Sequence, residues 1–451
     1  MGNNKLLDNQ EITERHRFRL FLLSCIALTT AGMVFSIRTS VMEDMGRVFS
    51  IPSESVGWAV GAAFLAFAIS VFIGSPMCDY LGMGRLLGLA CVCFIAGIAL
   101  VVFSPAVVAA IHLSPTTVLY LSWFIVGLGH GLVEAVINPL VATLYRDDKT
   151  HRLNVLHAWW PGGLVIGGVI ALLLRSSGVG GLEHGWQIRL GVIVVPSLIF
   201  GLMLIGERFP ATERVQSGVS GKEMLREALR PLFIIWFLMM WLTAALELGP
   251  GQWVDATLTK TVGFQGIWLL VYGSALMFVF RHFAGPLAHK LSPVGLMWFS
   301  SLLAGIGLFA ISYAKSPVTG LVSATIWYVG VCYMWPTMLG VCSERFPRGG
   351  AFLLGLMGSA GNLSTQFVLP LMGRVYDTYA QKALPAGVKL QELIAKAATD
   401  KAAKDLLEHA RTQAAPMAFR YVAALAIVLI VVFGAIWISD YLKGGYKAEK
   451  I

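Results

Sequence analysis

The segment Tyr120–Tyr145 reads YLSWFIVGLGHGLVEAVINPLVATLY, an apolar run longer than the roughly 20 residues that cross a bilayer as a helix. Glu134 lies inside this run, with His130 four residues before it and Asn138 four residues after it. Residues four apart share one face of a helix, so these three form a polar stripe that faces a cavity or a partner helix. An ionisable group at membrane depth is costly and by default marks a transport or proton pathway. The alternative is a packed hydrogen bond between helices.

The composition is that of a polytopic membrane protein. Of the 451 residues, 57% are hydrophobic and 13% are charged, whereas a soluble chain carries about 25% charged residues. The net charge is +9, but the charged residues lie in loops between apolar runs, which argues against nucleic acid as a partner. The polar amino end leads straight into a long apolar helix, so no cleavable signal is expected.

The sequence lacks the motifs of the common enzyme and ATPase sites. It contains no HExxH, no Gly-x-Ser-x-Gly and no Gly-x-x-x-x-Gly-Lys-Ser/Thr loop. Its six cysteines lie in or beside apolar segments without metal-ligand spacing, so we interpret them as small buried hydrophobic residues. We therefore expect neither an enzyme nor ATP-driven transport. No metal or cofactor is expected, and a proton gradient is the expected driving force.

Twelve apolar runs of about 20 residues predict twelve membrane-spanning helices. They lie near residues 18–41, 55–76, 85–104, 118–145, 153–174, 187–206, 231–254, 265–283, 294–314, 320–342, 351–373 and 417–439. An even number of spans puts both ends of the chain on one side. Lysine and arginine gather in the loops of that side, which predicts cytoplasmic termini. We expect a monomeric multi-pass protein of a bacterial inner membrane, in contact with the lipid bilayer and a small-molecule substrate.

Short repeats indicate two related halves. The fourth and tenth spans carry Pro139 and Pro336, each followed eight residues later by an acid, Asp147 or Glu344. Repeated halves with a binding site near the bilayer midplane are typical of transporters.

The repeats and the charge pattern predict three regions. We expect a six-helix bundle over residues 1–206, a cytoplasmic linker over 207–230 and a second six-helix bundle over 231–451. The second bundle contains an extracytoplasmic loop near 375–416, part of which reads as a solvated amphipathic helix.

This organisation resembles the major facilitator superfamily. The hallmark of that superfamily is a Gly-x-x-x-Asp-x-x-Gly loop with basic residues between its second and third helices, which Asp79, Gly82 and Arg85 match in part. The leading glycine is displaced to Gly74, and the second half has His289 in place of the acid. The resemblance implies an all-α membrane protein with twelve transmembrane helices in two pseudo-symmetric six-helix bundles, which transports by alternating access.

Within the superfamily, four segments resemble the fucose:proton symporter family. They are Glu134–Leu140, Leu153–Gly163, Glu247–Trp253 and Trp335–Thr337. The resemblance implies a proton-coupled symporter of a small polar solute, with a monosaccharide as the first choice. A nucleoside or a sugar acid is the second choice, and a proton-coupled drug exporter is the third. The chain departs from the family where Arg38 replaces an acid of the first helix and Trp160 replaces an amide of the fifth.

Four residues are candidates for proton coupling: Glu134, His130, Arg38 and Glu247. Desolvation disfavours the charged form of a carboxyl, so Glu134 in a low-dielectric cavity is suited to load and release a proton. Arg38 lies roughly 10–15 Å farther out than Glu134, at a rise of ~1.5 Å per residue, and His130 could bridge the two. Arg38 could instead reach the outer interface, or hold a substrate carboxylate, which would imply a sugar acid. Glu247 is a second titratable site or a structural partner.

Amides, an imidazole and aromatic rings are the candidates for substrate binding, because they suit the hydroxyls and the apolar face of a sugar. They are Asn138, His157, Trp160, Gln252, Trp253, Trp335, Asn362 and Gln366. Each polar side chain could instead join two helices, and each tryptophan could belong to the interfacial belt. Charged residues at the cytoplasmic helix ends are expected to form gate salt bridges: Asp79, Arg85, Arg146, Asp147, Glu344 and Arg345.

Overall fold

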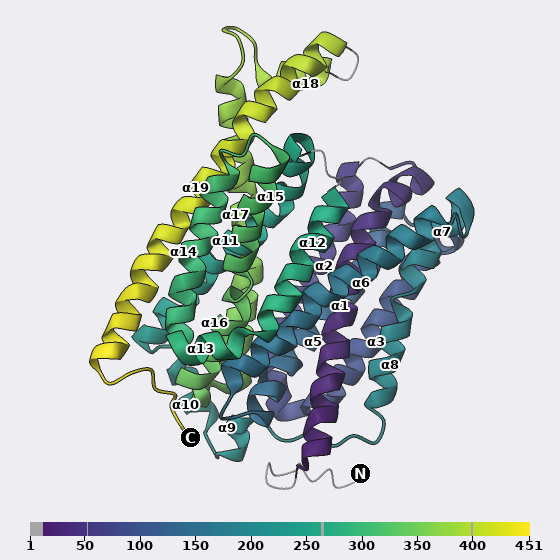
Figure 1. Cartoon of the computed structure of the whole chain (residues 1–451). Coiled ribbons are helices and arrows are strands. Elements are labelled where there is room, and N and C mark those ends of the chain that lie inside the picture. Colours follow the sequence, from purple (N-terminus) through teal and green to yellow (C-terminus); the bar gives the residue numbers. More distant parts are fainter. Residues whose placement is uncertain (1–11, 52, 263–265, 398–399) are drawn as a thin grey trace.

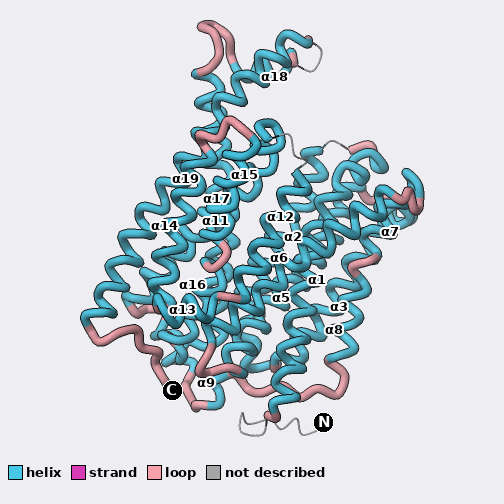
Figure 2. The backbone as a smooth tube through the Cα atoms, viewed as in Figure 1, coloured by secondary structure: helices cyan, strands magenta, loops and turns pink. Residues whose placement is uncertain are grey.

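The computed structural model describes residues 12–51, 53–262, 266–397 and 400–451, and this part of the chain is helical without a strand. Figure 2 shows that loops lie mainly at the two ends of a bundle of long helices. The α-helices are α1 (Glu14–Phe49), α2 (Ser53–Leu81), α3 (Met83–Val102), α4 (Ser104–Ile111), α5 (Pro115–Leu144), α6 (Lys149–Ser176), α7 (Gly181–Gly191), α8 (Val194–Met203), α9 (Glu213–Gln216), α10 (Gly221–Glu227), α11 (Pro231–Val262), α12 (Gly266–His282), α13 (Ala284–Leu291), α14 (Pro293–Ile311), α15 (Pro317–Val331), α16 (Met334–Arg345), α17 (Gly350–Lys382), α18 (Leu390–Lys396) and α19 (Lys401–Leu442).

The predicted fold class is confirmed. Ten helical segments of the described chain are long and apolar enough to cross a membrane. The predicted spans 265–283 and 351–373 coincide with α12 and α17, which complete the set of twelve. The apolar runs form helices because every backbone N–H and C=O must be satisfied within the segment in a bilayer. Two predicted spans consist of broken helices, namely α7 with α8 and α15 with α16.

The helices form two bundles, which lie side by side in Figure 1. Helices α1–α8, in purple to teal, form one bundle, and helices α11–α19, in teal to yellow, form the other. The start of α1 and the C-terminus lie at the same end of the molecule, which we call the base, and the opposite end is the top. The segment with α9 and α10 joins the bundles at the base.

Close backbone contact fixes α5 against α2. A Cβ atom added at Gly127 would lie 2.2 Å from the carbonyl oxygen of Ala63. A Cβ atom added at Gly131 would lie 2.0 Å from Oγ of Ser70. Small residues allow membrane helices to approach closely where the hydrophobic effect between helices is absent. The glycines of the segment Tyr120–Tyr145 therefore set the position of the helix that carries Glu134.

The base is closed by contacts between the two bundles. Lys149 of α6 donates to the carbonyl oxygen of Ser343 of α16 at 3.1 Å. Thr150 donates twice to the Glu344 carboxylate, from its backbone N at 3.0 Å and from Oγ1 at 2.7 Å. One turn farther in, Asn154 donates to Oγ1 of Thr337 at 3.1 Å. These hydrogen bonds hold the start of α6 against the end of α16.

A small helical unit projects from the top. The end of α17, α18 and the start of α19 enclose a separate apolar core that includes Leu384, Leu390, Leu393 and Leu407. The predicted amphipathic segment is therefore two helices, α18 and the first turns of α19, rather than one. Its apolar faces pack against each other and against α17 because burying leucine is favourable where an isolated helix is marginal.

Candidate functional site

A buried chain of hydrogen bonds joins three of the predicted site residues. Nδ2 of Asn138 donates to Oε2 of Glu134 at 2.9 Å and to the Glu134 backbone oxygen at 2.9 Å. Oδ1 of Asn138 lies 2.8 Å from Nε2 of His157 on α6. Because this oxygen can only accept, the imidazole carries its proton on Nε2. Nε2 of His157 also lies 4.0 Å from Oε2 of Glu134. The chain thus connects α5 to α6 inside one bundle.

Arg281 of α12 meets this chain from the other bundle. Its guanidinium donates to the carbonyl oxygen of Cys332 at 2.5 Å and to that of His157 at 2.7 Å. It also pairs with Oε1 of Glu247 at 3.4 Å and interacts electrostatically with Glu134. Arg281 is 2% exposed. One arginine of the second bundle therefore contacts the first bundle at His157, pairs with Glu247 and interacts electrostatically with Glu134.

Prolines explain why two backbone oxygens are free to accept from Arg281. In a helix, the carbonyl of a residue normally accepts from the N–H four residues later, and proline has no N–H. Pro161 lies four residues after His157, and Pro336 lies four residues after Cys332. The carbonyls of His157 and Cys332 thus lack their helical donors, and Arg281 supplies the donors.

The other two coupling candidates lie apart from this network. The His130 ring packs edge-on against Phe67, with the ring centroids 4.7 Å apart. The Arg38 guanidinium is buried between the rings of Phe35 and Phe64, each 4.8 Å away. Arg38 is 6% exposed, so it does not reach an outer interface.

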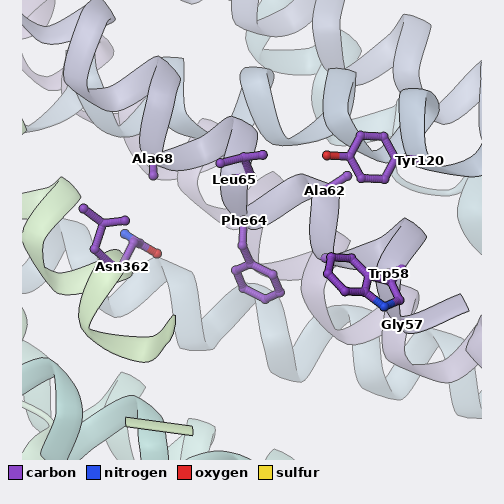
Figure 3. A pocket seen from close by; sticks show the side chains of 10 residues that line it. Gly57, Trp58, Ala62, Phe64, Leu65, Ala68, Tyr120 and Asn362 are labelled. Carbon is purple, nitrogen blue, oxygen red and sulfur yellow. The ribbon is translucent and has the colours of Figure 1, made fainter. Parts of the chain in front are cut away.

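A cavity of about 530 Å³ lies between the bundles, along the half of α2 nearer the top. Its lining is mostly apolar and comprises Gly57, Trp58, Gly61, Ala62, Phe64, Leu65, Ala68, Tyr120, Asn362 and Leu363. Figure 3 shows Asn362 on α17 across from the residues of α2 and α5. Asn362 is the predicted substrate residue that lines this cavity, and its Nδ2 donates to the Gly358 oxygen at 3.0 Å.

Two of the three predicted tryptophans, Trp160 and Trp335, contribute to packing. Trp160 packs on Phe35 with centroids 5.8 Å apart. Trp335 lies where a side chain at Gly361 would have to be, 2.3 Å from its Cβ position. The side chains of Gln252, Trp253 and Gln366 lie outside the described residues. The roles predicted for these residues in substrate binding stay predictions.

Several of the predicted gate residues form contacts at the base. Asp79 pairs with Nη2 of Arg214 at 2.6 Å and also accepts from Thr212. Arg214 and Thr212 belong to the linker between the bundles, so this pair fastens the linker to the end of α2. The hydroxyl of Tyr446, in the C-terminal tail, donates to Glu344 at 2.5 Å. Burial and the nearby Glu344 carboxylate raise the pKa of Tyr446 well above its ordinary value.

The remaining gate candidates differ in their surroundings. Arg345 pairs with Asp440 of α19, and Arg146 donates to Gln216 of the linker. Arg85 and Asp147 are exposed, and neither has an ion-pair partner among the described residues. A gate function for Arg85 and Asp147 stays a prediction.

Comparison with known proteins assigns the chain to a family. The model of the Major Facilitator Superfamily matches residues 20–368. The chain belongs to the major facilitator superfamily. It is therefore a multi-pass membrane transporter rather than an enzyme. No curated protein sequence matches it significantly.

Solved structures of other superfamily transporters share the fold. The proton:xylose symporter XylE bound to 6-bromo-6-deoxy-D-glucose superimposes with a TM-score of 0.74 at 14% identity, over 93% of this chain and 96% of that one. The transporter FucP in its outward conformation gives 0.71 at 16% identity, over 94% and 99%. The human organic anion transporter MFSD10 gives 0.63 at 14% identity, over 93% and 99%.

Sequence reasoning missed Arg281, which is the centre of the network in this superfamily member. Arg281 lies two residues before the end of the predicted span 265–283, where a basic residue is ordinary, and no role is predicted for it. A signal was present, because apolar residues resume after Arg281 and His282 as Phe283, Ala284 and Leu287. An arginine flanked by apolar residues on both sides is an intramembrane arginine, which needs a partner.

Proposed function

We propose that the protein is a proton-coupled symporter of a small polar solute of monosaccharide size. The observation that carries this proposal is that Arg281, at the contact between the bundles, interacts with two buried acids. Arg281 pairs with Glu247 at 3.4 Å and interacts electrostatically with Glu134. A change of charge at Glu134 would therefore act on the contact that Arg281 makes with His157 of the other bundle.

Glu134 is suited to carry the proton because no lysine or arginine of the described residues pairs with it directly. Its hydrogen-bond partner Asn138 is neutral, and Arg281 pairs directly with Glu247 instead. A buried carboxylate without a paired cation is costly, and protonation removes that cost. When the proton leaves, Glu134 competes with Glu247 for Arg281. This competition links proton release to a rearrangement between the bundles.

Alternating access supplies the transport cycle. Thr150, Lys149 and Asn154 of one bundle are hydrogen-bonded to the other bundle at the base. The cavity lies nearer the top, between α2 and α17. This combination corresponds to a state that is closed at the base, and rocking of one bundle against the other would open it. We propose that the base is cytoplasmic, in a bacterial inner membrane, as the distribution of lysine and arginine favours.

The cavity and the structural neighbours support this substrate class. A volume of about 530 Å³ accommodates a solute of monosaccharide size. Two of the structural neighbours, the proton:xylose symporter XylE and the fucose:proton symporter FucP, are named as sugar symporters, which favours a monosaccharide here.

The test is uptake into proteoliposomes that contain the purified full-length protein. An inward proton gradient should drive accumulation of a radiolabelled monosaccharide, and a protonophore should abolish it. Empty liposomes control for leakage. Uptake that equilibrates at the same level with and without the gradient would contradict proton coupling.

A further inference from the structure

Arg38 differs from the other buried cations of the chain. Five buried lysine or arginine side chains each have a carboxylate partner: Lys149 with Glu213, Arg189 with Asp44, Arg214 with Asp79, Arg281 with Glu247, and Arg345 with Asp440. Arg38 is as buried as these, yet it has no carboxylate partner among the described residues. A buried charge is costly unless it is paired and hydrogen-bonded. Among the described residues, Arg38 is therefore a buried positive charge without a carboxylate partner.

Aromatic rings surround Arg38 without satisfying its donors. The rings of Phe35 and Phe64 each lie 4.8 Å from the guanidinium carbon, and that of Trp123 lies 6.0 Å away. Such rings contact the flat face of a guanidinium and leave the N–H groups along its edge free to bind. Nε of Arg38 is buried without a hydrogen-bond partner, and its other nitrogens donate to no described residue. The aromatic rings thus hold the guanidinium in place, while no described residue accepts a hydrogen bond from its edge.

The guanidinium lies directly behind the wall of the cavity. Phe64 lines the cavity and also covers Arg38. The other lining residues include no acid and no base, and their side-chain polar groups belong to Trp58, Tyr120 and Asn362. The positive charge of Arg38 lies on the far side of Phe64, one of the lining residues. A planar carboxylate matches the N–H edge of a guanidinium, because two parallel hydrogen bonds can form.

We propose that the transported solute carries a carboxylate that binds Arg38, so that the substrate class is an acidic monosaccharide rather than a neutral one. This inference rests on the proposed function, which supplies the size of the solute. On binding, the carboxylate occupies the free edge of the guanidinium beside Phe64. The uncharged part of the bound monosaccharide then lies along the apolar lining formed by α2.

The test compares pairs of probes that differ by one carboxylate. D-glucuronate is paired with D-glucose, and D-galacturonate with D-galactose, in equilibrium binding to the purified full-length protein. At least one acid should bind about tenfold or more tightly than its neutral partner, because hydrogen bonds to charged groups are among the strong ones. The proposal is overturned if each neutral sugar binds as well as its acid, or if neither acid binds.

Variants of Arg38 locate the effect. Arg38→Gln should remove the preference for the acid and leave the affinity for the neutral sugar unchanged. Arg38→Lys should keep part of the preference, because lysine keeps the positive charge but cannot form the two parallel hydrogen bonds of a guanidinium. Arg47→Gln is the matched control, since Arg47 lies on the same helix with an exposed side chain. An equal loss of affinity for both probes in Arg38→Gln would assign Arg38 to packing and refute the proposal.

The two proposals fail in different ways. Proton-driven accumulation of a neutral sugar, without binding of its acid, refutes the carboxylate inference and leaves the symporter proposal standing. Binding of an acid through Arg38, without proton-driven accumulation, refutes the symporter proposal and leaves the carboxylate inference standing. The comparison of probes on the unmodified protein needs no variant, so misfolding of Arg38→Gln would not prevent a decision.

Discussion

Replacing Arg281 by methionine should destabilise the protein strongly. The change removes three hydrogen bonds, to Cys332 at 2.5 Å, to His157 at 2.7 Å and to Glu247 at 3.4 Å. It also leaves the Glu247 carboxylate buried without a cation. Removing one partner of a buried ion pair costs about 3–5 kcal/mol. We therefore expect Arg281→Met to lower the free energy of unfolding by about 3–5 kcal/mol.

The second substitution makes this prediction specific. Glu247→Met in the Arg281→Met background removes the orphaned carboxylate, and an apolar pair is tolerated where a broken ion pair is not. The double variant should be more stable than the sum of the two single effects implies, by about 0.5–3 kcal/mol. Reversible unfolding in mixed micelles with SDS, followed by circular dichroism, measures these free energies.

The control is Arg374→Met, because Arg374 is exposed and has no ion-pair partner among the described residues. This variant should unfold like the parent protein. Strict additivity of Arg281→Met and Glu247→Met would refute the reasoning, since it would mean that the two side chains do not interact.

Two further predictions concern helix packing and the base. Gly127→Ala should destabilise the protein, because the added Cβ would lie 2.2 Å from the Ala63 oxygen. The control Gly88→Ala would place its Cβ with nothing within 4 Å and should be neutral or slightly stabilising. Unfolding in mixed micelles compares the two variants, and equal stability would contradict the close α2–α5 contact. Tyr446→Phe removes the 2.5 Å hydrogen bond to Glu344, which contributes about 1 kcal/mol. The ratio of molecules open at the base to molecules closed at the base should therefore rise about fivefold. Thiol labelling of a cysteine introduced at the base should increase, and unchanged labelling would show that the C-terminal tail does not stabilise the closed base.

The helices could be predicted from the sequence because the bilayer fixes their length and their apolar character. Each predicted span coincides with a helix or a broken helix pair. The breaks at α7–α8 and α15–α16 were not predicted, because hydropathy measures apolar content and not backbone continuity. The contact of Glu134 with Asn138 could be predicted because both lie one turn apart on one helix.

Contacts between distant segments could not be read from spacing. Residues four apart advance by about 40° beyond a full turn, so His130 and Asn138 diverge on the helix surface, and His130 contacts Phe67 instead. The free carbonyls of His157 and Cys332 follow from Pro161 and Pro336, but the sequence does not say which donor reaches them. Arg281 reaches both because α12 packs against α6 and α15, which is a property of the tertiary fold.

Glu134→Gln tests the central claim, that Glu134 carries the coupled proton, most directly. The amide mimics the protonated acid at almost the same volume and can still accept from Asn138. In proteoliposomes, accumulation driven by an imposed proton gradient should stop, while exchange of internal for external substrate should continue, because exchange needs no deprotonation. Glu392→Gln, at the exposed projection on the top, should retain both activities. Proton-driven accumulation by Glu134→Gln at the level of the parent protein would contradict the account.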